Sequence, residues 1–383
     1  MRIRELDGLR ALAIMAVIYT HYVPWFPALG SRLGWLGVDL FFVLSGFLIT
    51  SILLELRNEP GYFRTFYLRR ALRIFPPYFL VLFFFIAASI AVHHPGTVAE
   101  WSQYIFYYSS LLPRSLASQI FVDAHLVEPI SIGICVLWSL SVEEVYYTLW
   151  APLIRFTNRR VFLLILGGMI VGAAGARWVL CPPNILWNFS FYTRMDGLAL
   201  GSLLAITVEH SNRHTEWWQK RSMLLNVVTC SLLAGSAVLW ASYYNAQQKP
   251  LAISVGLSMV DISFALVVFA AIRYAGQPVW WARLLRTRLL KLISDTSYSL
   301  YLIHYFVFDC IQHAAPYVVP SLQAGKRTSA VLQCVSSFLI SLAISMAMRH
   351  WIEQPILRLK DRFAPVRTSS KSRATKNVPV LSA

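Results

Sequence analysis

Long apolar stretches recur along almost the whole chain and constrain its fold more than any other feature. Each holds roughly 20 residues, the length that an α-helix needs to cross the hydrocarbon core of a bilayer. Only 14% of the 383 residues are charged, whereas a soluble domain carries about a quarter. The sequence therefore predicts an all-α, polytopic membrane protein with about ten spans. The predicted spans are 9–27, 37–56, 76–92, 136–154, 161–179, 189–208, 223–244, 253–274, 293–314 and 330–352.

The loops between these stretches alternate in their content of basic residues. Cytoplasmic loops of membrane proteins carry the excess of Lys and Arg. The basic loops are therefore assigned to the cytoplasm, and an even number of spans places both termini there. The predicted cytoplasmic segments are 2–4, 57–73, 155–160, 213–221, 273–291 and 358–376. The sparse basic residues assigned to the outer side are Arg32, Arg114, Arg177, Lys249, Lys326 and Arg327.

Two segments do not fit the pattern of spans. An aromatic-rich run at 101–112 would, as an eleventh span, place the later basic loops outside. It is therefore interpreted as an interfacial helix or a re-entrant segment. The tail at 360–383 is basic and rich in Ser, which predicts a disordered cytoplasmic segment. Residues 1–359 form one predicted transmembrane domain, and its first helix lacks the small-residue cleavage site of a signal peptide.

Charge and cysteine usage argue against two classes of function. The formal net charge is +16, but the positive residues lie in short clusters between apolar stretches. That pattern follows membrane topology and does not form a nucleic-acid-binding face. The five cysteines are scattered and show no Cys/His ligand spacing, so neither a disulfide framework nor a metal site is expected.

Ionisable residues within the predicted spans are costly in lipid and usually mark function. His21 lies eleven positions after Arg10, which places it ~16 Å further along the first helix, toward the outer side. Because histidine titrates near neutrality, His21 is the natural general base. The ionisable residues at similar depth predict one polar cavity open to the outer face, or, equally, structural ion pairs such as Glu143 with Arg194. These residues are Asp39, Glu143, Glu144, Arg194, Asp196, Asp261, His304 and Asp309.

A second cluster of charge lies where the third predicted span begins. Arg69 or Arg70 shares a helical face with Arg73, and guanidinium groups bind phosphate oxygens bidentately. The phosphates of coenzyme A would suit such a site. On charge alone, ordinary cytoplasmic snorkelling explains these arginines better.

Short motifs follow one another in a fixed order from residue 4 to residue 355. They are Arg4-Glu-Leu-Asp-Gly-Leu-Arg10 with His21, Gly37-Val-Asp-Leu-Phe-Phe-Val-Leu-Ser-Gly46, the Arg-rich start of the third span, Trp138-Ser-Leu-Ser-Val-Glu-Glu144, Arg194-Met-Asp-Gly197, Ser297-Tyr-Ser-Leu-Tyr-Leu-Ile-His304 and Glu353-Gln-Pro355. The ordered set resembles the acyltransferase-3 family of bacterial integral membrane acyltransferases. Val145 is a small departure, because the family commonly has Gln there.

The resemblance implies an enzyme of the bacterial cytoplasmic (inner) membrane that moves an acyl group, most often acetyl, from acyl-CoA to a hydroxyl of a carbohydrate or glycolipid acceptor. It implies that the Arg10/His21 pair is essential and that His21 is catalytic. Some relatives carry a fused esterase-like domain, for which this sequence has no room, so the stand-alone form is expected. The resemblance assigns acyl-CoA binding to Arg69, Arg70 and Arg73 and places Ser139 and Glu143 in the motif of the fourth span. Glu144 and Tyr298 are further candidate site residues.

The expected mechanism leaves several choices open. His21 either deprotonates the acceptor hydroxyl or carries the acyl group itself, and Glu143 or Asp39 would orient its ring. Arg194 could stabilise the oxyanion or pair with Asp196. Three other functions are compatible with the sequence: acylation of a small-molecule glycoside, proton-coupled transport or lipid flipping, and a role in assembly with a degenerate site. Outer aromatic residues could stack on sugars or simply form an interfacial belt.

Overall fold

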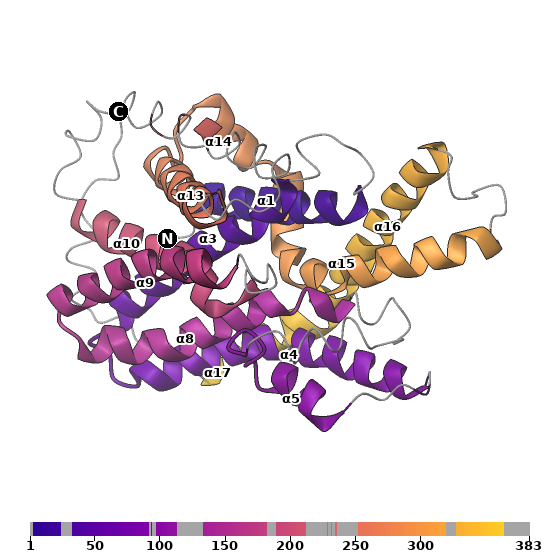
Figure 1. Ribbon diagram of the computed structural model, residues 1–383, viewed down its shortest axis with the longest axis horizontal. Helices are drawn as coiled ribbons and strands as arrows, with labels where there is room; N and C mark the ends of the chain where they lie inside the picture. Colours follow the sequence, from indigo (N-terminus) through magenta and orange to yellow (C-terminus); the bar gives the residue numbers. More distant parts are fainter. Residues whose placement is uncertain are drawn as a thin grey trace.

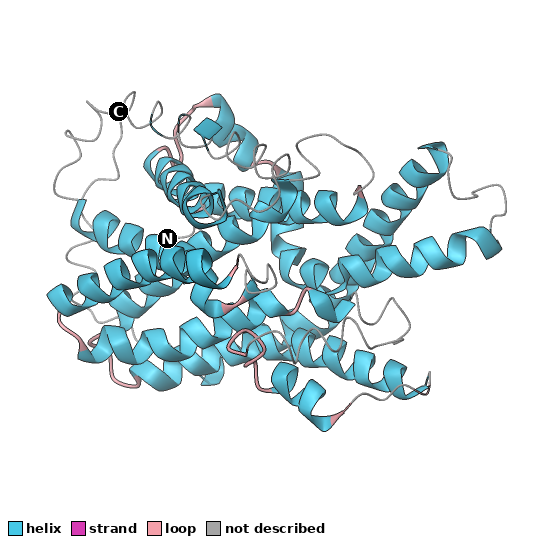
Figure 2. Cartoon of the chain, viewed as in Figure 1, coloured by secondary structure: helices cyan, strands magenta, loops and turns pink. Residues whose placement is uncertain are grey.

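The computed structural model places helices throughout the part of the chain that it describes, and no strand occurs there (Figure 2). This confirms the all-α prediction for those residues. The predicted span 223–244 lies almost wholly outside them, as does the end of the basic tail. The described residues are 3–23, 33–91, 93, 97–112, 133–181, 189–211, 228, 231, 234–235, 252–318 and 327–363.

Most of the long helices run along the long axis of the molecule (Figure 1). α1 packs against α3 and α15, and α15 packs against α16. The described elements are α1 (Arg4–Tyr22), η1 (Gly34–Leu36), α3 (Gly37–Leu56), α4 (Tyr62–Ala91), α5 (Val98–Ile105), α8 (Trp138–Phe156), α9 (Arg159–Leu180), α10 (Phe191–Ser211), η3 (Ala252–Gly256), α13 (Leu257–Arg273), α14 (Trp280–Leu285), α15 (Arg288–Val318), α16 (Arg327–Met348), η4 (Arg349–Glu353) and α17 (Gln354–Phe363).

Five described helical segments are long and apolar enough to cross a membrane. Four more helices, α1, α8, α10 and α15, have 19, 19, 21 and 31 residues, but charged and hydroxyl side chains interrupt their apolar sequence. The protein is thus a multi-pass membrane protein, while the total of ten spans and the side on which the termini lie stay predictions. The five apolar segments are Gly34–Leu56, Tyr62–Ala91, Arg159–Leu180, Ile253–Arg273 and Thr328–Leu359.

The third predicted span lies on a helix that begins well before the span itself. The prediction began it at the two prolines, but α4 starts at Tyr62 and contains both Pro76 and Pro77. Proline removes one helical hydrogen bond and disfavours the helix interior. The helix persists because the residues before the prolines, Tyr62 and Phe66 among them, are buried against the bundle. The arginine cluster therefore lies on α4 itself.

The aromatic-rich run at 101–112 does not form a spanning helix. α5 has only eight residues, far fewer than the roughly 20 that a span requires. A capping box fixes its start, since Glu100 N–H donates to the Thr97 hydroxyl at 3.2 Å and Thr97 N–H donates to the Glu100 carboxylate at 2.5 Å. Tyr78 on α4 donates to the Tyr104 carbonyl at 2.9 Å, which holds α5 against α4.

Two glycines let α3 and α10 pack closely. A Cβ on Gly46 would lie 2.0 Å from the Leu198 carbonyl oxygen, and one on Gly201 would lie 2.1 Å from the Val43 carbonyl oxygen. Small residues at such positions allow the backbones of membrane helices to approach. This contact fixes the two helices that carry Asp39 and Arg194.

Candidate active site

Two histidines from opposite ends of the sequence meet between α1 and α15. His21 Nδ1 lies 2.7 Å from His304 Nε2, with the ring centroids 5.0 Å apart and the ring planes inclined by 22°. Tyr305 stacks on His21 at 4.3 Å with an interplanar angle of 5°. The His21 ring is therefore held in one orientation by a hydrogen bond at its edge and an aromatic ring on its face.

The partners of His304 determine which nitrogen of His21 carries the proton. His304 Nδ1 lies 2.9 Å from the Tyr301 carbonyl oxygen, which only accepts, so Nδ1 must donate. In a neutral imidazole the other nitrogen then accepts, so His304 Nε2 receives the proton of His21 Nδ1. His21 Nε2 is consequently left with its lone pair, as a general base or nucleophile requires.

Neighbouring helices brace this histidine pair. The Tyr22 hydroxyl donates to the His304 carbonyl at 2.9 Å and lies 3.1 Å from Ser341 Oγ on α16. Cys334 Sγ lies 3.0 Å from the Tyr22 carbonyl. Three helices, α1, α15 and α16, therefore set the backbone position of His304, and His21 itself stays half-buried, with accessible surface.

A cluster of arginines forms around the other end of α1. Arg10 interacts electrostatically with Arg70, Glu143 and Asp7, with its guanidinium 3.9 Å from the Asp7 carboxylate. The Arg70 guanidinium lies 5.0 Å above the Tyr147 ring. Positive charges interact across α1 and α4, because Arg73 on α4 also interacts with Arg10.

The carboxylate of Glu143 does not neutralise this cluster directly. Its two oxygens accept from the Ser45 and Tyr147 hydroxyls, each at 2.7 Å. Arg69 and Arg73 lie four residues apart on α4 and so share a face, and Arg73 remains exposed. The cluster is thus a concentration of guanidinium groups with accessible surface, which suits a phosphate-bearing ligand.

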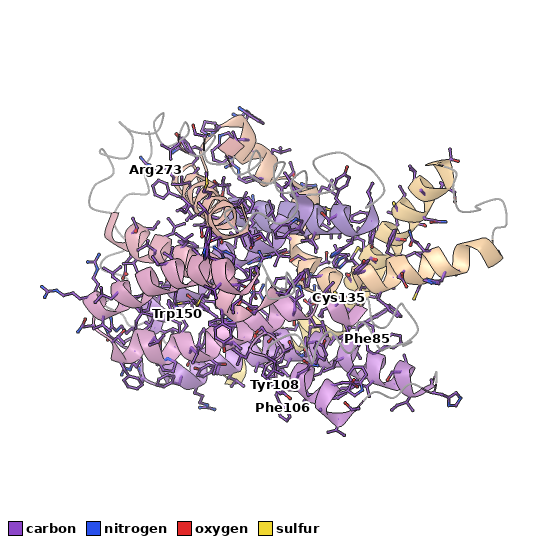
Figure 3. All side chains as sticks on the ribbon, in the orientation of Figure 1. Phe85, Phe106, Tyr108, Cys135, Trp150 and Arg273 are labelled. Atoms are coloured by element: carbon purple, nitrogen blue, oxygen red, sulfur yellow. The ribbon has the colours of Figure 1, made fainter. Side chains whose placement is uncertain are left out.

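Tyrosine and serine hydroxyls on α8 and α15 connect the arginine cluster to the histidine pair. Tyr298 donates to the Ile74 carbonyl at 3.0 Å, directly after Arg73. One turn further along α15, the Tyr301 hydroxyl lies 2.7 Å from Ser139 Oγ, and His304 follows. Cys135, labelled in Figure 3, lies beside this part of α15. We call this series, from the arginines to His21, the polar column.

A separate set of charges lies buried among α3, α9, α10 and α13. Arg177 donates to Asp196 at 2.6 and 3.0 Å and to Ser258 Oγ at 2.6 Å. Arg194 donates to Asp39 at 2.6 Å and lies 5.0 Å from the Trp35 ring. All four charged side chains are at most 1% exposed. These contacts tie helices together.

Several expectations about these charges were wrong. Neither Glu143 nor Asp39 orients His21, because Glu143 is bonded to two hydroxyls and Asp39 to Arg194. Arg194 forms an ion pair with Asp39, which was not predicted. For these groups the structure confirms the alternative of structural ion pairs over a shared cavity, because the Asp39–Arg194 and Arg177–Asp196 pairs form a buried cluster of their own.

Arg177 was also misplaced by the sequence. It was counted with the basic residues of the outer side, at the end of the predicted span 161–179, but it is a fully buried residue of α9. Of the remaining candidates, Asp261 is buried beside Gly197, and Asp309 lies 3.3 Å from His313 Nδ1. The contact of His304 with His21 was not predicted, although His304 was a candidate site residue.

The closing motif at Glu353 has a structural role that sequence reasoning missed. The Glu353 carboxylate accepts from the Ser299 hydroxyl, and Arg349 lies 3.2 Å from Asp295. Both contacts hold η4 against α15, the helix that carries His304. At the other end of the chain, Glu5 accepts from the Gly276 N–H at 2.9 Å, which anchors α1 before α14. The signal that could have predicted these contacts is a motif that places a carboxylate at the end of a helix.

Comparison with known proteins points the same way as the geometry. The profile of the family described as "Acyltransferase domain" matches residues 3–350. Peptidoglycan O-acetyltransferase OatA of Listeria monocytogenes is 28% identical over 92% of this chain and 55% of its own length. O-acetyltransferase OatA of Staphylococcus aureus is 30% identical over 78% of this chain and 49% of its length.

A further relative, the putative peptidoglycan O-acetyltransferase YrhL of Bacillus subtilis, is 25% identical over 92% of this chain and 54% of its own length. The chain thus spans about half the length of the curated relatives that it matches. No solved structure was found to match it. Since the family profile covers nearly all of the bundle that holds the histidine pair, the chain belongs to the acyltransferase-3 family.

Proposed function

We propose that the chain is a membrane-bound O-acyltransferase that moves an acyl group, in the simplest case acetyl, from acyl-CoA to a hydroxyl of a cell-wall or cell-surface carbohydrate. The membrane is the bacterial cytoplasmic membrane. The names of the relatives support the class of reaction and a peptidoglycan-like acceptor. A small glycoside is the alternative acceptor, and it would use the same chemistry.

The observation that carries the proposal is the hydrogen-bonded pair His21–His304 at the end of the polar column. A thioester whose phosphates bind Arg10, Arg70 and Arg73 at one end of α1 would extend along this column toward His21, ~16 Å further on. An acceptor hydroxyl would approach from the opposite end of the bundle. Donor and acceptor would thus meet at a ring nitrogen that is free to take a proton.

The reaction balances with the groups present. The acceptor oxygen attacks the thioester carbonyl while His21 Nε2 takes its proton. A C–O bond forms, the C–S bond breaks, and the CoA thiolate leaves and receives the proton from the imidazolium. His304 Nε2 keeps accepting from His21 Nδ1 throughout, which stabilises the protonated ring as a carboxylate does in hydrolase triads. In the covalent variant, Nε2 attacks the thioester and passes the acyl group to the hydroxyl in a second step.

Transfer of labelled acetyl from acetyl-CoA, measured with the purified protein in liposomes and a muropeptide or polysaccharide acceptor, tests the proposal. We expect a covalent acetyl ester from the wild type and a loss of about 10²–10⁴-fold in His21→Ala. His313→Ala is the matched control, because His313 lies on α15 but is 52% exposed. A folded His21→Ala protein with the wild-type rate would refute the scheme. A protein that moves its ligand across the bilayer without forming an ester would be a transporter.

A further inference from the structure

Tyr107 is a strained residue whose side chain is buried beside the polar column. Its φ is +55°, a left-handed conformation that few residues other than glycine and asparagine adopt. Its side chain is only 8% exposed, and its hydroxyl has no hydrogen-bond partner among the described residues. Strain and an unmatched buried hydroxyl persist only where the surroundings enforce them.

The surroundings that enforce this conformation come from α8 and α4. Ser141 donates to the Tyr107 carbonyl at 2.7 Å and accepts from the Ser110 N–H at 3.0 Å. The Tyr107 ring stacks on Tyr78 with centroids 4.3 Å apart and on Phe75 at 5.9 Å. The segment after α5 is thus folded over α4 so that the ring lies against the residues that follow Arg73.

The Tyr107 hydroxyl interacts electrostatically with Tyr298, which belongs to the polar column. It also interacts with Glu144, and both Tyr298 and Glu144 are half-buried with accessible surface. Tyr298 is bound to the backbone at Ile74, one residue after Arg73. Burial raises the pKa of Tyr107 above its ordinary value, so the hydroxyl stays protonated and is available as a donor.

Resting on the proposed function, we propose that Tyr107 and Glu144 form a subsite for the amide-bearing pantetheine arm of acyl-CoA. Both residues interact with Tyr298, which lies between the arginines and the histidine pair, where that arm would pass under the proposed function. The arm carries amide carbonyls, which accept from a tyrosine hydroxyl, and amide N–H groups, which donate to a carboxylate. Tyr107 contacts the ligand in this arrangement, and Ser141 is a positioning residue.

Equilibrium binding to the detergent-purified protein tests the subsite with two probes. Coenzyme A carries the pantetheine arm, and adenosine 3′,5′-bisphosphate carries phosphates without it. Tyr107→Phe removes only the hydroxyl and should weaken coenzyme A about three- to tenfold, the range for one hydrogen bond, with no change for the bisphosphate. Ser141→Ala should weaken coenzyme A selectively as well, because it releases the Tyr107 backbone.

Tyr108→Phe is the matched control, because the Tyr108 hydroxyl lies 2.5 Å from Ser102 Oγ, and it should change neither affinity. Tyr108 lies at the end of α5 in Figure 3. Wild-type affinity for coenzyme A in Tyr107→Phe would overturn the subsite alone, and so would an equal loss for both probes. A wild-type protein that binds neither probe would overturn the proposed function and the subsite with it.

Discussion

The Arg177–Asp196 pair and the Arg10–Arg70–Arg73 cluster both depend on arginine, but they differ in how far the guanidinium groups are buried and paired. In the pair, guanidinium and carboxylate are both 0% exposed and bonded to one another. In the cluster, Arg73 is exposed and Arg10 is half-buried. The comparison teaches that a fully buried arginine with a bonded carboxylate ties helices together, whereas under the proposed function an arginine with accessible surface binds a ligand.

The largest effect on stability should come from breaking the Arg177–Asp196 pair. Arg177→Leu leaves the Asp196 carboxylate buried and uncompensated, which costs about 3–5 kcal/mol, a large part of the stability of a typical domain. We expect little folded protein, measured as the monodisperse yield in detergent and the midpoint of thermal unfolding. Arg177→Leu with Asp196→Leu should recover most of the yield and also the transfer activity. A double variant that is stable but inactive would show that the pair has a chemical role, contrary to the structural role assigned to it here.

The next effect separates chemistry from stability. His304→Leu removes the acceptor for His21 Nδ1 and should lower acetyl transfer about 10–100-fold, as loss of such an orienting partner usually does. The unfolding midpoint should change much less than in Arg177→Leu. His304→Gln, which offers an oxygen acceptor, should retain more activity than His304→Leu. Equal rates in the two variants would show that hydrogen bonding to His304 is irrelevant.

A smaller effect, on ligand binding, is expected in the arginine cluster. Arg73→Gln removes one charged hydrogen-bonding group from a ligand phosphate, worth about 1.5–3 kcal/mol. The KM for acetyl-CoA should rise about tenfold or more while kcat stays near the wild-type value. Arg283→Gln, an exposed arginine on α14, is the control and should leave KM unchanged. A large fall in stability in Arg73→Gln would show that this arginine, like Arg177, has a structural role.

The smallest effect belongs to a pair at the surface. Lys291 is 43% exposed and bonds to Asp295, which keeps Arg349 as a second partner at 3.2 Å. Lys291→Ala should therefore lower stability by less than about 1 kcal/mol. Thermal unfolding at low and high salt checks this, because an exposed pair is screened by salt. A loss of stability as large as that of Arg177→Leu would contradict the expectation that an exposed ion pair contributes less to stability than a buried one.

The presence of helices was predictable from the sequence. The ends of the helices and the positions of polar residues within them were harder to predict. The stretch 37–56 coincides with α3 because apolar residues dominate it and its two acidic residues, Asp39 and Glu55, lie near its ends. The start of α4 was missed because Pro76 and Pro77 look like a boundary, and only tertiary burial of Tyr62 shows that the helix continues across them. Arg177, at the end of the predicted span 161–179, was counted with the basic residues of the outer side because hydropathy cannot reveal a buried partner 19 residues away.

The residues of the candidate site were predictable, but their pairing was not. His21 and the arginines stood out because charge is rare in apolar helices. The partner of His21 is 283 residues away, and helical periodicity gives the face of each helix but not which faces meet. Tyr107 gave no signal at all, since nothing in an aromatic-rich segment marks one tyrosine as strained.

The separation of His21 and His304 along the chain also bears on how the protein is made. α1 is the first described helix to leave the ribosome, and α15 follows after most of the other helices. The histidine pair therefore cannot form until residue 304 has been translated and α15 has docked beside α1. Chains that stall earlier in translation lack the partner of His21 Nδ1, so the hydrogen bond that orients the His21 ring arises only in the assembled bundle.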